Sequence, residues 1–208
     1  GAWTPVAANA EKILDIGTGT GLLALMLAQK NSTAVIDAIE LDKDAAGQAA
    51  ENVNSSPWRD RINIIQADAV RYQYERSYHL IISNPPFFNN SLLGAKEQRN
   101  SARHTITMNY RELFETIKNT LSDGGVASVL LPAGNFHLWE EMLTANNWQV
   151  IEQLNIYPRT GLTANRIVAL CQPGTQFETT VQQLYIKEAD NSYTTEFENL
   201  LSPYYLDK

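Results

Sequence analysis

Residues 13–21 read Ile13-Leu14-Asp15-Ile16-Gly17-Thr18-Gly19-Thr20-Gly21. The apolar start predicts a short strand, and the apolar residues after Gly21 predict a buried helix. Glycines at such a junction let the backbone turn sharply and let a ligand lie against main-chain atoms. In open α/β sheets, ligands bind beyond the carboxyl ends of the strands. This stretch therefore predicts an α/β fold with a ligand site at the end of its first strand.

The spacing of the glycines narrows the kind of ligand. A dinucleotide fingerprint requires G-x-G-x-x-G, but here the pattern is G-x-G-x-G and Leu22 takes the place of the third glycine. A P-loop is excluded because no Gly-Lys-Ser/Thr follows. Asp15 stands two residues before the first glycine, where its carboxylate can meet an ammonium group. An amino-acid ligand is favoured over a pyrophosphate.

Strand-like and helix-like segments alternate along the whole chain, which predicts an open, mostly parallel sheet with helices on both faces. No linker or repeat divides the chain, so we expect a single domain over residues 1–208. The expected strands are Lys12–Ile16, Ala34–Ile39, Arg61–Gln66, Tyr78–Ser83, Val126–Leu131, Val150–Tyr157, Arg166–Gln172 and Val181–Ile186. The expected helices are Leu22–Gln29, Lys43–Val53 after an Asp42 cap, Tyr110–Leu121, Asn135–Asn146 and one starting near Ser192. A Gly124-Gly125 turn precedes the fifth strand, and the long loop from Asn84 to Met108 is a functional candidate.

Acidic residues end the second and third strands. Glu40 can accept hydrogen bonds from both hydroxyls of a ribose, and Asp68 can accept one from an adenine amino group. Either acid alone is more often an ordinary solvated charge. Together with Asp15, they put carboxylates at three successive strand tips, which indicates one binding site.

Asp15-x-Gly17-x-Gly19-x-Gly21, Glu40 and Asp68 resemble the cofactor motifs of class I S-adenosylmethionine-dependent methyltransferases. The resemblance implies a Rossmann-like, seven-stranded sheet of order 3-2-1-4-5-7-6 with the last strand antiparallel. It also implies that the glycine loop holds the methionine part of S-adenosylmethionine, Glu40 the ribose and Asp68 the adenine. The expected cofactor contacts are Asp15, Gly17, Thr18, Gly19, Gly21, Glu40, Leu41, Asp68, Ala69 and Asn84.

The motif Asn84-Pro85-Pro86-Phe87 follows the fourth strand, which lies beside the first strand in that order. A planar exocyclic or amide nitrogen is a poor nucleophile because its lone pair is delocalised. The side-chain oxygen of Asn84 and the carbonyl of Pro85 can accept its two N–H groups and so free the lone pair. Consecutive prolines supply no competing N–H, and Phe87 can stack a base. The expected catalytic residues are Asn84, Pro85, Pro86 and Phe87, which act through position and fixed dipoles rather than a general base.

Longer stretches resemble the bacterial tRNA(Val) adenine-N6 methyltransferases almost from end to end. These stretches are Gly1-Ala2-Trp3, Gly21–Gln29, Ser56-Pro57-Trp58, Ile81–Phe88, Glu97-Gln98-Arg99, Ala102-Arg103-x-Thr105 and Leu201–Leu206. The resemblance implies N6-methylation of the adenine at position 37, next to the anticodon of one valine tRNA. It implies that the substrate is contacted by Phe87, Phe88, Arg99, Arg103 and His104. Phe87 stands where the family often has Tyr, so the stacking face is kept and the hydroxyl is lost.

Three alternatives compete with this interpretation. A protein-glutamine N5 methyltransferase has Asn-Pro-Pro-Tyr in the same place and usually a helical domain upstream, for which this chain has no room. A ribosomal-RNA guanine-N2 methyltransferase usually has His after Asn-Pro-Pro-Phe, whereas Phe88 follows here. A cofactor-binding module without catalysis would not need the intact motif.

Charge and composition restrict the partners. The net charge of −7 disfavours a generic nucleic-acid surface, so RNA affinity is expected from a local patch between Lys96 and Arg111, with four basic residues against Glu97. One cysteine, Cys171, and three scattered histidines predict no metal site, and Cys171 is expected to be buried. No apolar run is long enough for a membrane span and no signal peptide is recognisable, so a cytoplasmic protein is expected. The start without Met predicts a missing upstream segment.

Overall fold

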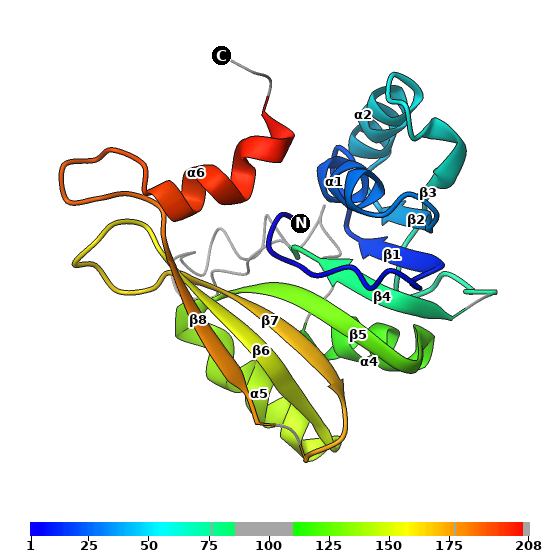
Figure 1. Ribbon diagram of the computed structural model, residues 1–208. Coiled ribbons are helices and arrows are strands. Elements are labelled where there is room, and N and C mark those ends of the chain that lie inside the picture. The colour runs from blue at the N-terminus through cyan, green and yellow to red at the C-terminus, as the bar shows by residue number, and fades with distance from the viewer. Residues whose placement is uncertain (76, 86–109, 177, 206–208) are drawn as a thin grey trace, which may run out of the picture.

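The computed structural model describes residues 1–75, 77–85, 110–176 and 178–205, and in these residues eight strands form one sheet (Figure 1). The strands are β1 (Lys12–Ile16), β2 (Val35–Glu40), β3 (Ile62–Gln66), β4 (Tyr78–Ser83), β5 (Leu121–Pro132), β6 (Trp148–Tyr157), β7 (Arg166–Pro173) and β8 (Thr180–Tyr185). The helices are α1 (Leu22–Lys30), α2 (Lys43–Asn54), α4 (Tyr110–Thr120), α5 (Phe136–Ala145) and α6 (Thr195–Leu201). Short 3₁₀ turns are η1 (Arg59–Arg61), η2 (Ala133–Asn135) and η3 (Ser202–Tyr204).

The strand order is β3-β2-β1-β4-β5-β7-β6-β8. β7, the last of the first seven strands along the chain, runs antiparallel to both β5 and β6, and every other pair of neighbours is parallel. This confirms the predicted mostly parallel sheet and the order of its first seven strands. The family resemblance implied seven strands, one fewer than this sheet has, whereas the sequence pattern predicted the eighth strand at Val181–Ile186. The tail strand joins the same sheet because it pairs with β6 from Thr180 to Tyr185 and its Leu184 is buried on the side of α6.

β5 begins earlier than the sequence indicated. Tyr78 pairs with Leu121, whereas Leu80 pairs with Val126, so the register on β5 shifts across the glycine pair. Gly124 has φ +71°, which an L side chain rarely adopts, and this allows the extra residues to bulge out. The predicted Gly124-Gly125 turn is therefore an irregularity inside a strand of twelve residues, not a break before a short strand.

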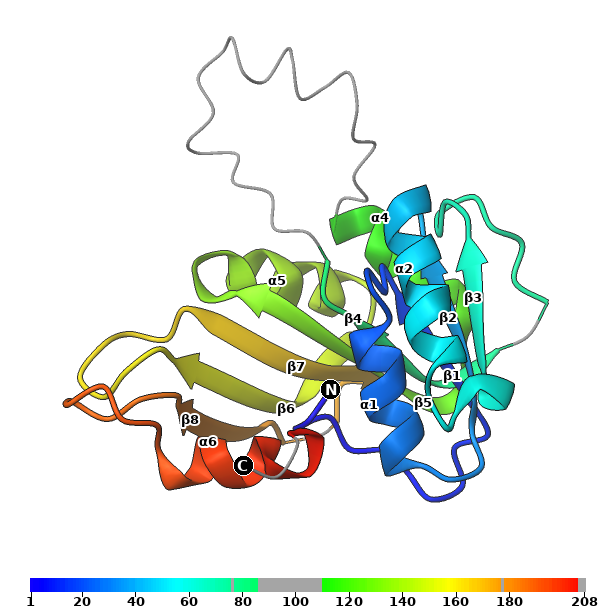
Figure 2. The ribbon, with the colours of Figure 1, turned by 90° about the horizontal axis from the view of Figure 1, so that it is seen from above.

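Helices cover the two faces of the sheet, as predicted (Figure 2). On one face, Trp139 of α5 belongs to the same core cluster as Ile81 of β4. On the other face, Leu27 of α1 packs in a second cluster with Ile36 of β2. Cys171 is fully buried as predicted, and Trp139 Nε1 donates to its Sγ at 3.4 Å. Among the described residues, no helix combines the length and the apolar composition that a membrane span requires.

The N-terminal segment crosses the face of the sheet that carries α1 and α6 (Figure 1). Trp3 Nε1 donates to Gln182 Oε1 on β8 at 3.1 Å, and the hydroxyls of Thr4 and Ser128 share a buried hydrogen bond of 2.8 Å. Lys30 at the end of α1 donates to backbone oxygens of residues 1, 2 and 4. These contacts fasten the segment to α1, β5 and β8 together.

Candidate functional site

The tips of β1 and β4 lie side by side at the carboxyl edge of the sheet. Ile16 pairs with Ser83 in the parallel register, and Ser83 Oγ donates to the Ile16 carbonyl at 2.9 Å. The next residues along the two strands are Gly17 and Asn84, so they start from neighbouring positions on strands about 4.8 Å apart. The Asn84 side chain is exposed there, and Pro85 is buried. The glycine loop and the start of the Asn-Pro-Pro-Phe motif therefore share one edge.

The glycine loop folds back over the end of β2. The N–H groups of Gly17 and Thr18 both donate to the Ile39 carbonyl, at 2.9 and 3.0 Å. Gly17 and Gly19 have φ +71° and +58°, and a Cβ at either position would meet no atom within 4 Å. Both positions therefore need glycine for conformation, and both face open space in which a ligand can approach the backbone.

Glycine is needed at the third position of the loop, Gly21, for a different reason. Gly21 has φ +86° at the N-cap of α1, and a Cβ there would lie 3.4 Å from Ala49 Cβ on α2. Asn52, one turn further along α2, donates through Nδ2 to the Thr20 carbonyl at 2.9 Å. α2 thus packs against the loop and holds it, a contribution from Asn52 that the sequence motif did not reveal.

Asp15 is completely buried beneath this loop. Its Oδ2 accepts a hydrogen bond of 2.6 Å from Thr18 Oγ1, but its Oδ1 is buried without a hydrogen-bond partner. Burial raises the pKa of this carboxyl to about 6, although the Thr18 hydroxyl and the Ala24 N–H favour the ionised form. A buried acceptor without a donor is costly, so the site fits a ligand that brings a positively charged donor, such as the ammonium of an amino acid.

Glu40 ends β2, as predicted, and connects two turns. Its Oε2 accepts from the Gly19 N–H at 2.8 Å and its Oε1 accepts from the Asp42 N–H at 3.0 Å. A carboxylate has about four acceptor positions, so Glu40 can accept further hydrogen bonds from a ligand while it holds Gly19. Leu41 follows with 44% of its surface exposed, which puts an apolar side chain beside this acid.

Asp68 lies two residues beyond the end of β3 rather than in the strand itself. Its Oδ1 accepts from the Val70 N–H at 2.9 Å, and its Oδ2 lies 3.4 Å from Arg71 Nε. These local contacts orient the carboxylate and use part of its acceptor capacity. Ala69 beside it is buried, and Val70 is 41% exposed. Val70 lies in the turn after β3, and no sequence motif marked this exposed apolar side chain.

The remaining predicted site residues lie outside the described part of the chain. These are Pro86, Phe87, Phe88, Arg99, Arg103 and His104. The described residues bring together Asp15, the glycines, Glu40, Asp68 and Asn84 at one edge of the sheet, through the pairing of β1 with β2 and β4 and of β2 with β3. Among the described residues, no group of His, Cys, Asp or Glu could hold a metal ion.

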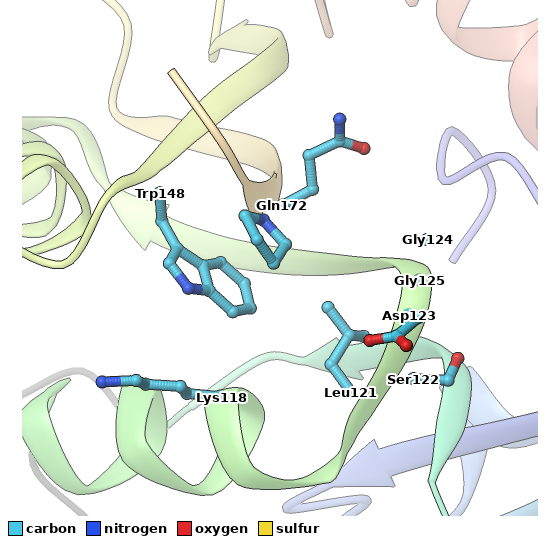
Figure 3. A pocket seen from close by; sticks show the side chains of 9 residues that line it. Lys118, Leu121, Ser122, Asp123, Gly124, Gly125, Trp148 and Gln172 are labelled. Atoms are coloured by element: carbon cyan, nitrogen blue, oxygen red, sulfur yellow. The ribbon is translucent and has the colours of Figure 1, made fainter. Parts of the chain in front are cut away.

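A cavity of about 480 Å³ lies at the opposite edge of the sheet (Figure 3). It opens where β5 and β6 begin and β7 ends, and is lined by Lys118, Leu121, Ser122, Asp123, Gly124, Gly125, Trp148, Gln172 and Pro173. None of the predicted site residues lines it. We assign the functional site to the carboxyl edge because the buried unpartnered oxygen of Asp15 and the open glycine backbone are there.

The fold of this chain is that of known methyltransferases. A predicted O-methyltransferase from Agrobacterium tumefaciens superposes with a TM-score of 0.74 at 18% identity, over 97% of this chain and 93% of that one. A glycopeptide N-methyltransferase crystallised with S-adenosylmethionine superposes with a TM-score of 0.55 at 12% identity, over 79% and 82% of the two chains. Residues 4–132 match the methyltransferase small domain. The sheet, the glycine loop and these matches define a class I methyltransferase.

Two relatives in sequence define the family more narrowly. The tRNA1(Val) (adenine(37)-N6)-methyltransferase of Tolumonas auensis is 42% identical over 207 residues, which cover 99% of this chain and 86% of that protein. The enzyme of the same name from Photorhabdus laumondii is 37% identical, over 99% and 85% of the two chains. This chain belongs to the tRNA1(Val) (adenine(37)-N6)-methyltransferase family.

Proposed function

We propose that this protein uses S-adenosylmethionine to methylate N6 of the adenine at position 37, next to the anticodon of tRNA1(Val). The relatives that carry this name match nearly the whole chain. One observation of this structure supports the proposal most strongly. Asn84 and Gly17 directly follow a paired position on β4 and β1, so an acceptor for the target nitrogen lies beside the loop that suits the cofactor. Since tRNA is a cytoplasmic substrate, the proposed reaction takes place in the cytoplasm.

The chain offers a matching group for each part of the cofactor. Asp15 Oδ1 pairs with the ammonium, and the open backbone at Gly17 and Gly19 accommodates the methionine chain. Glu40 accepts from the ribose hydroxyls with Leu41 beside it. Asp68 and Ala69 face the adenine. When bound, S-adenosylmethionine supplies a methyl group on a positively charged sulfur.

Asn84 and Pro85 carry the chemistry on the substrate side. The Asn84 side-chain oxygen and the Pro85 carbonyl each accept one N–H of the adenine amine, which draws the nitrogen lone pair out of conjugation. Asn84 and Pro85 would hold the nitrogen in line with the methyl group that S-adenosylmethionine supplies when bound, and the methylated nitrogen would then lose its extra proton to solvent. No general base is needed before transfer, so orientation and fixed dipoles supply the rate.

Residues of the motif and of the loop after it, which lie outside the described part of the chain, complete the proposal for the RNA side. Pro86 keeps the turn free of a competing N–H. Phe87 and Phe88 stack the target base. Arg99, Arg103 and His104 contact the anticodon arm. The target adenine stands in a single-stranded loop, so turning it out of its stack costs little.

The direct test compares the parent enzyme with Asn84→Ala. The parent should transfer labelled methyl groups to unmodified tRNA1(Val) and not to ribosomal RNA or release factor, with the label at N6 of adenine 37. Asn84→Ala should keep the cofactor Kd and lose most of kcat. Asn54→Ala is the matched control, because Asn54 is exposed at the far end of α2. Equal turnover by Asn84→Ala and the parent contradicts the role of Asn84, and methylation of release factor or ribosomal RNA contradicts the substrate.

A further inference from the structure

The outer face of β6 and β8 is an uncharged surface of amides and tyrosines. In the parallel register Gln153 pairs with Val181, Asn155 with Gln183, and Tyr157 with Tyr185. Residues opposite each other in a register point to the same face, so these six side chains form one ladder. We call them the amide–tyrosine face. Its members are partly or fully exposed, and Val181 is its only aliphatic residue, with 55% of its surface exposed.

This face continues the side of the sheet that α5 covers. Ile167 and Ala169 of β7 pair with Asn155 and Gln153, and both are buried in the core cluster that contains Trp139 of α5. α6 and the N-terminal segment lie on the other side, where Leu184 is buried (Figures 1 and 2). α5 contacts β6, where the side chains of this face are half-buried, whereas Val181 and Gln183 on β8 are exposed.

The two tyrosines form a stack that is partly exposed. The rings of Tyr157 and Tyr185 lie 4.5 Å apart at an interplanar angle of 20°. Tyr185 stands on the edge strand of the described sheet, and the returning chain lies beside its backbone, because Thr194 donates to the carbonyls of Tyr185 and Ile186. Next to the stack, Gln153 Nε2 donates to Asn155 Oδ1 at 2.8 Å and the Tyr185 hydroxyl donates to Gln183 Oε1 at 3.3 Å. Another flat ring can therefore extend the stack, and the amides beside it can hydrogen-bond that ring's edge.

Two cations border the same end of the face. Arg159 follows β6 and Lys187 follows β8, and these two loops are joined because the Thr160 N–H donates to the Lys187 carbonyl at 2.9 Å. Figure 1 shows the two loops side by side beyond the ends of both strands. The nearby carboxylates of Glu188 and Asp190 accept hydrogen bonds from Thr160 and Ser192. Arg159 Nη1 donates to Asn191 Oδ1 at 3.4 Å, and Lys187 Nζ lies 5.5 Å from the centre of the Tyr193 ring. The border thus offers two cations beside the amides and tyrosines, balanced by two carboxylates.

We infer that the amide–tyrosine face binds single-stranded nucleotides of the RNA substrate, with a base stacked on Tyr185 and its phosphates near Arg159 and Lys187. Aromatic platforms with adjacent amides and cations are what single-stranded RNA requires. A protein partner of this chain's own kind fits less well, because interface cores between protomers are mostly apolar. β6 and β8 end at the same sheet edge as β4, three and four strand spacings away, or ~14 and ~19 Å. One RNA can therefore reach both the amide–tyrosine face and Asn84. The inference rests on the proposed tRNA function.

The test measures KM and Kd for an unmodified anticodon-arm RNA with Tyr185→Ala and Tyr185→Phe. Removing one base–aromatic stack should raise KM and Kd about 5- to 140-fold in Tyr185→Ala, while kcat and the cofactor Kd stay at the parent values. Tyr185→Phe keeps the ring and should bind RNA like the parent. A double variant, Arg159→Gln with Lys187→Gln, should lower the slope of log Kd against log salt. Arg59→Gln, in η1 at the opposite edge of the sheet, is the matched charge control and should leave this slope unchanged.

Three results would overturn the inference. Parent values of KM and salt slope in all variants would remove the face from the RNA site while leaving the proposed function intact. Equal loss of RNA binding in Tyr185→Ala and Tyr185→Phe would exclude stacking. A change in molecular mass of Tyr185→Ala in solution would assign the edge to a second copy of this chain. If the parent itself methylates no RNA, the proposed function fails first and the face has no RNA to bind.

Discussion

Cofactor binding should release a proton, and Asp15 should be its source. Burial raises the pKa of this carboxyl to about 6 in the protein without ligand. An ammonium placed at the unpartnered Oδ1 favours the ionised form and lowers the pKa again. Binding of S-adenosylmethionine therefore requires the ionised carboxylate and displaces whatever proton it carries.

The size of the effect follows from the pKa. At pH 6 about half of the molecules carry a proton on Asp15, so binding should release about half a proton per site, falling to about a tenth at pH 7. Below pH 6 the apparent affinity should fall about tenfold for each pH unit. Asp15→Asn removes the titrating group and the charge, so its affinity should be weaker and nearly independent of pH between 5 and 7.5.

The assay is titration calorimetry with S-adenosylhomocysteine, which keeps the ammonium, in pairs of buffers with different ionisation enthalpies. The difference in heat between the two buffers gives the number of protons released. Asp44→Asn is the control, because Asp44 is exposed in the first turn of α2. No release at pH 6 by the parent, or equal release by Asp15→Asn, would refute the assignment of Asp15 to the ammonium.

The raised pKa of Asp15 should also make the stability of the folded protein depend on pH. In the folded protein Asp15 holds its proton up to about pH 6, whereas in the unfolded chain it loses the proton near the ordinary pKa of 3.8. The folded state therefore binds more protons between these values, and its stability falls as pH rises through that window. Above pH 6, Asp15→Asn should be more stable than the parent by up to about 3 kcal/mol, measured by urea unfolding without ligand. An Asp15→Asn variant that is less stable than the parent above pH 6 would contradict the cost assigned to burying the ionised carboxylate.

Two further substitutions test the support of the site. Glu40→Gln should raise the cofactor Kd about tenfold, which corresponds to about 1.4 kcal/mol. The reason is that an amide oxygen can still accept from Gly19, whereas an acceptor for the ribose is lost. Calorimetry measures the Kd, with the exposed Glu51→Gln as control, and an unchanged Kd would remove Glu40 from the ribose site. Arg61 donates to the carbonyls of Ala28, Asn31 and Ala34, so Arg61→Met should lower the free energy of unfolding by about 2–3 kcal/mol. Urea unfolding beside Arg59→Met, whose side chain is 65% exposed, measures it, and equal stability of the two variants would refute the role.

Local sequence patterns determined most elements of this fold. The bounds of β1 and β4 agree with the predicted Lys12–Ile16 and Tyr78–Ser83, and the Asp42 cap of α2 accepts the expected N–H groups of its first turn. These features depend on hydrophobic periodicity and cap chemistry within a few residues, which a sequence displays directly. The glycine loop was predictable for the same reason, since positive φ at Gly17, Gly19 and Gly21 is a local requirement.

Only the tertiary structure decided which distant residues meet. The addition of β8 to the sheet depends on pairing with β6, and the Tyr157–Tyr185 stack depends on the register of that pairing. The unpartnered oxygen of Asp15 depends on the way the loop, α1 and β2 close over it, and the role of Arg61 on three carbonyls about thirty residues away. Such contacts arise from packing between segments far apart in the chain, so no local pattern records them.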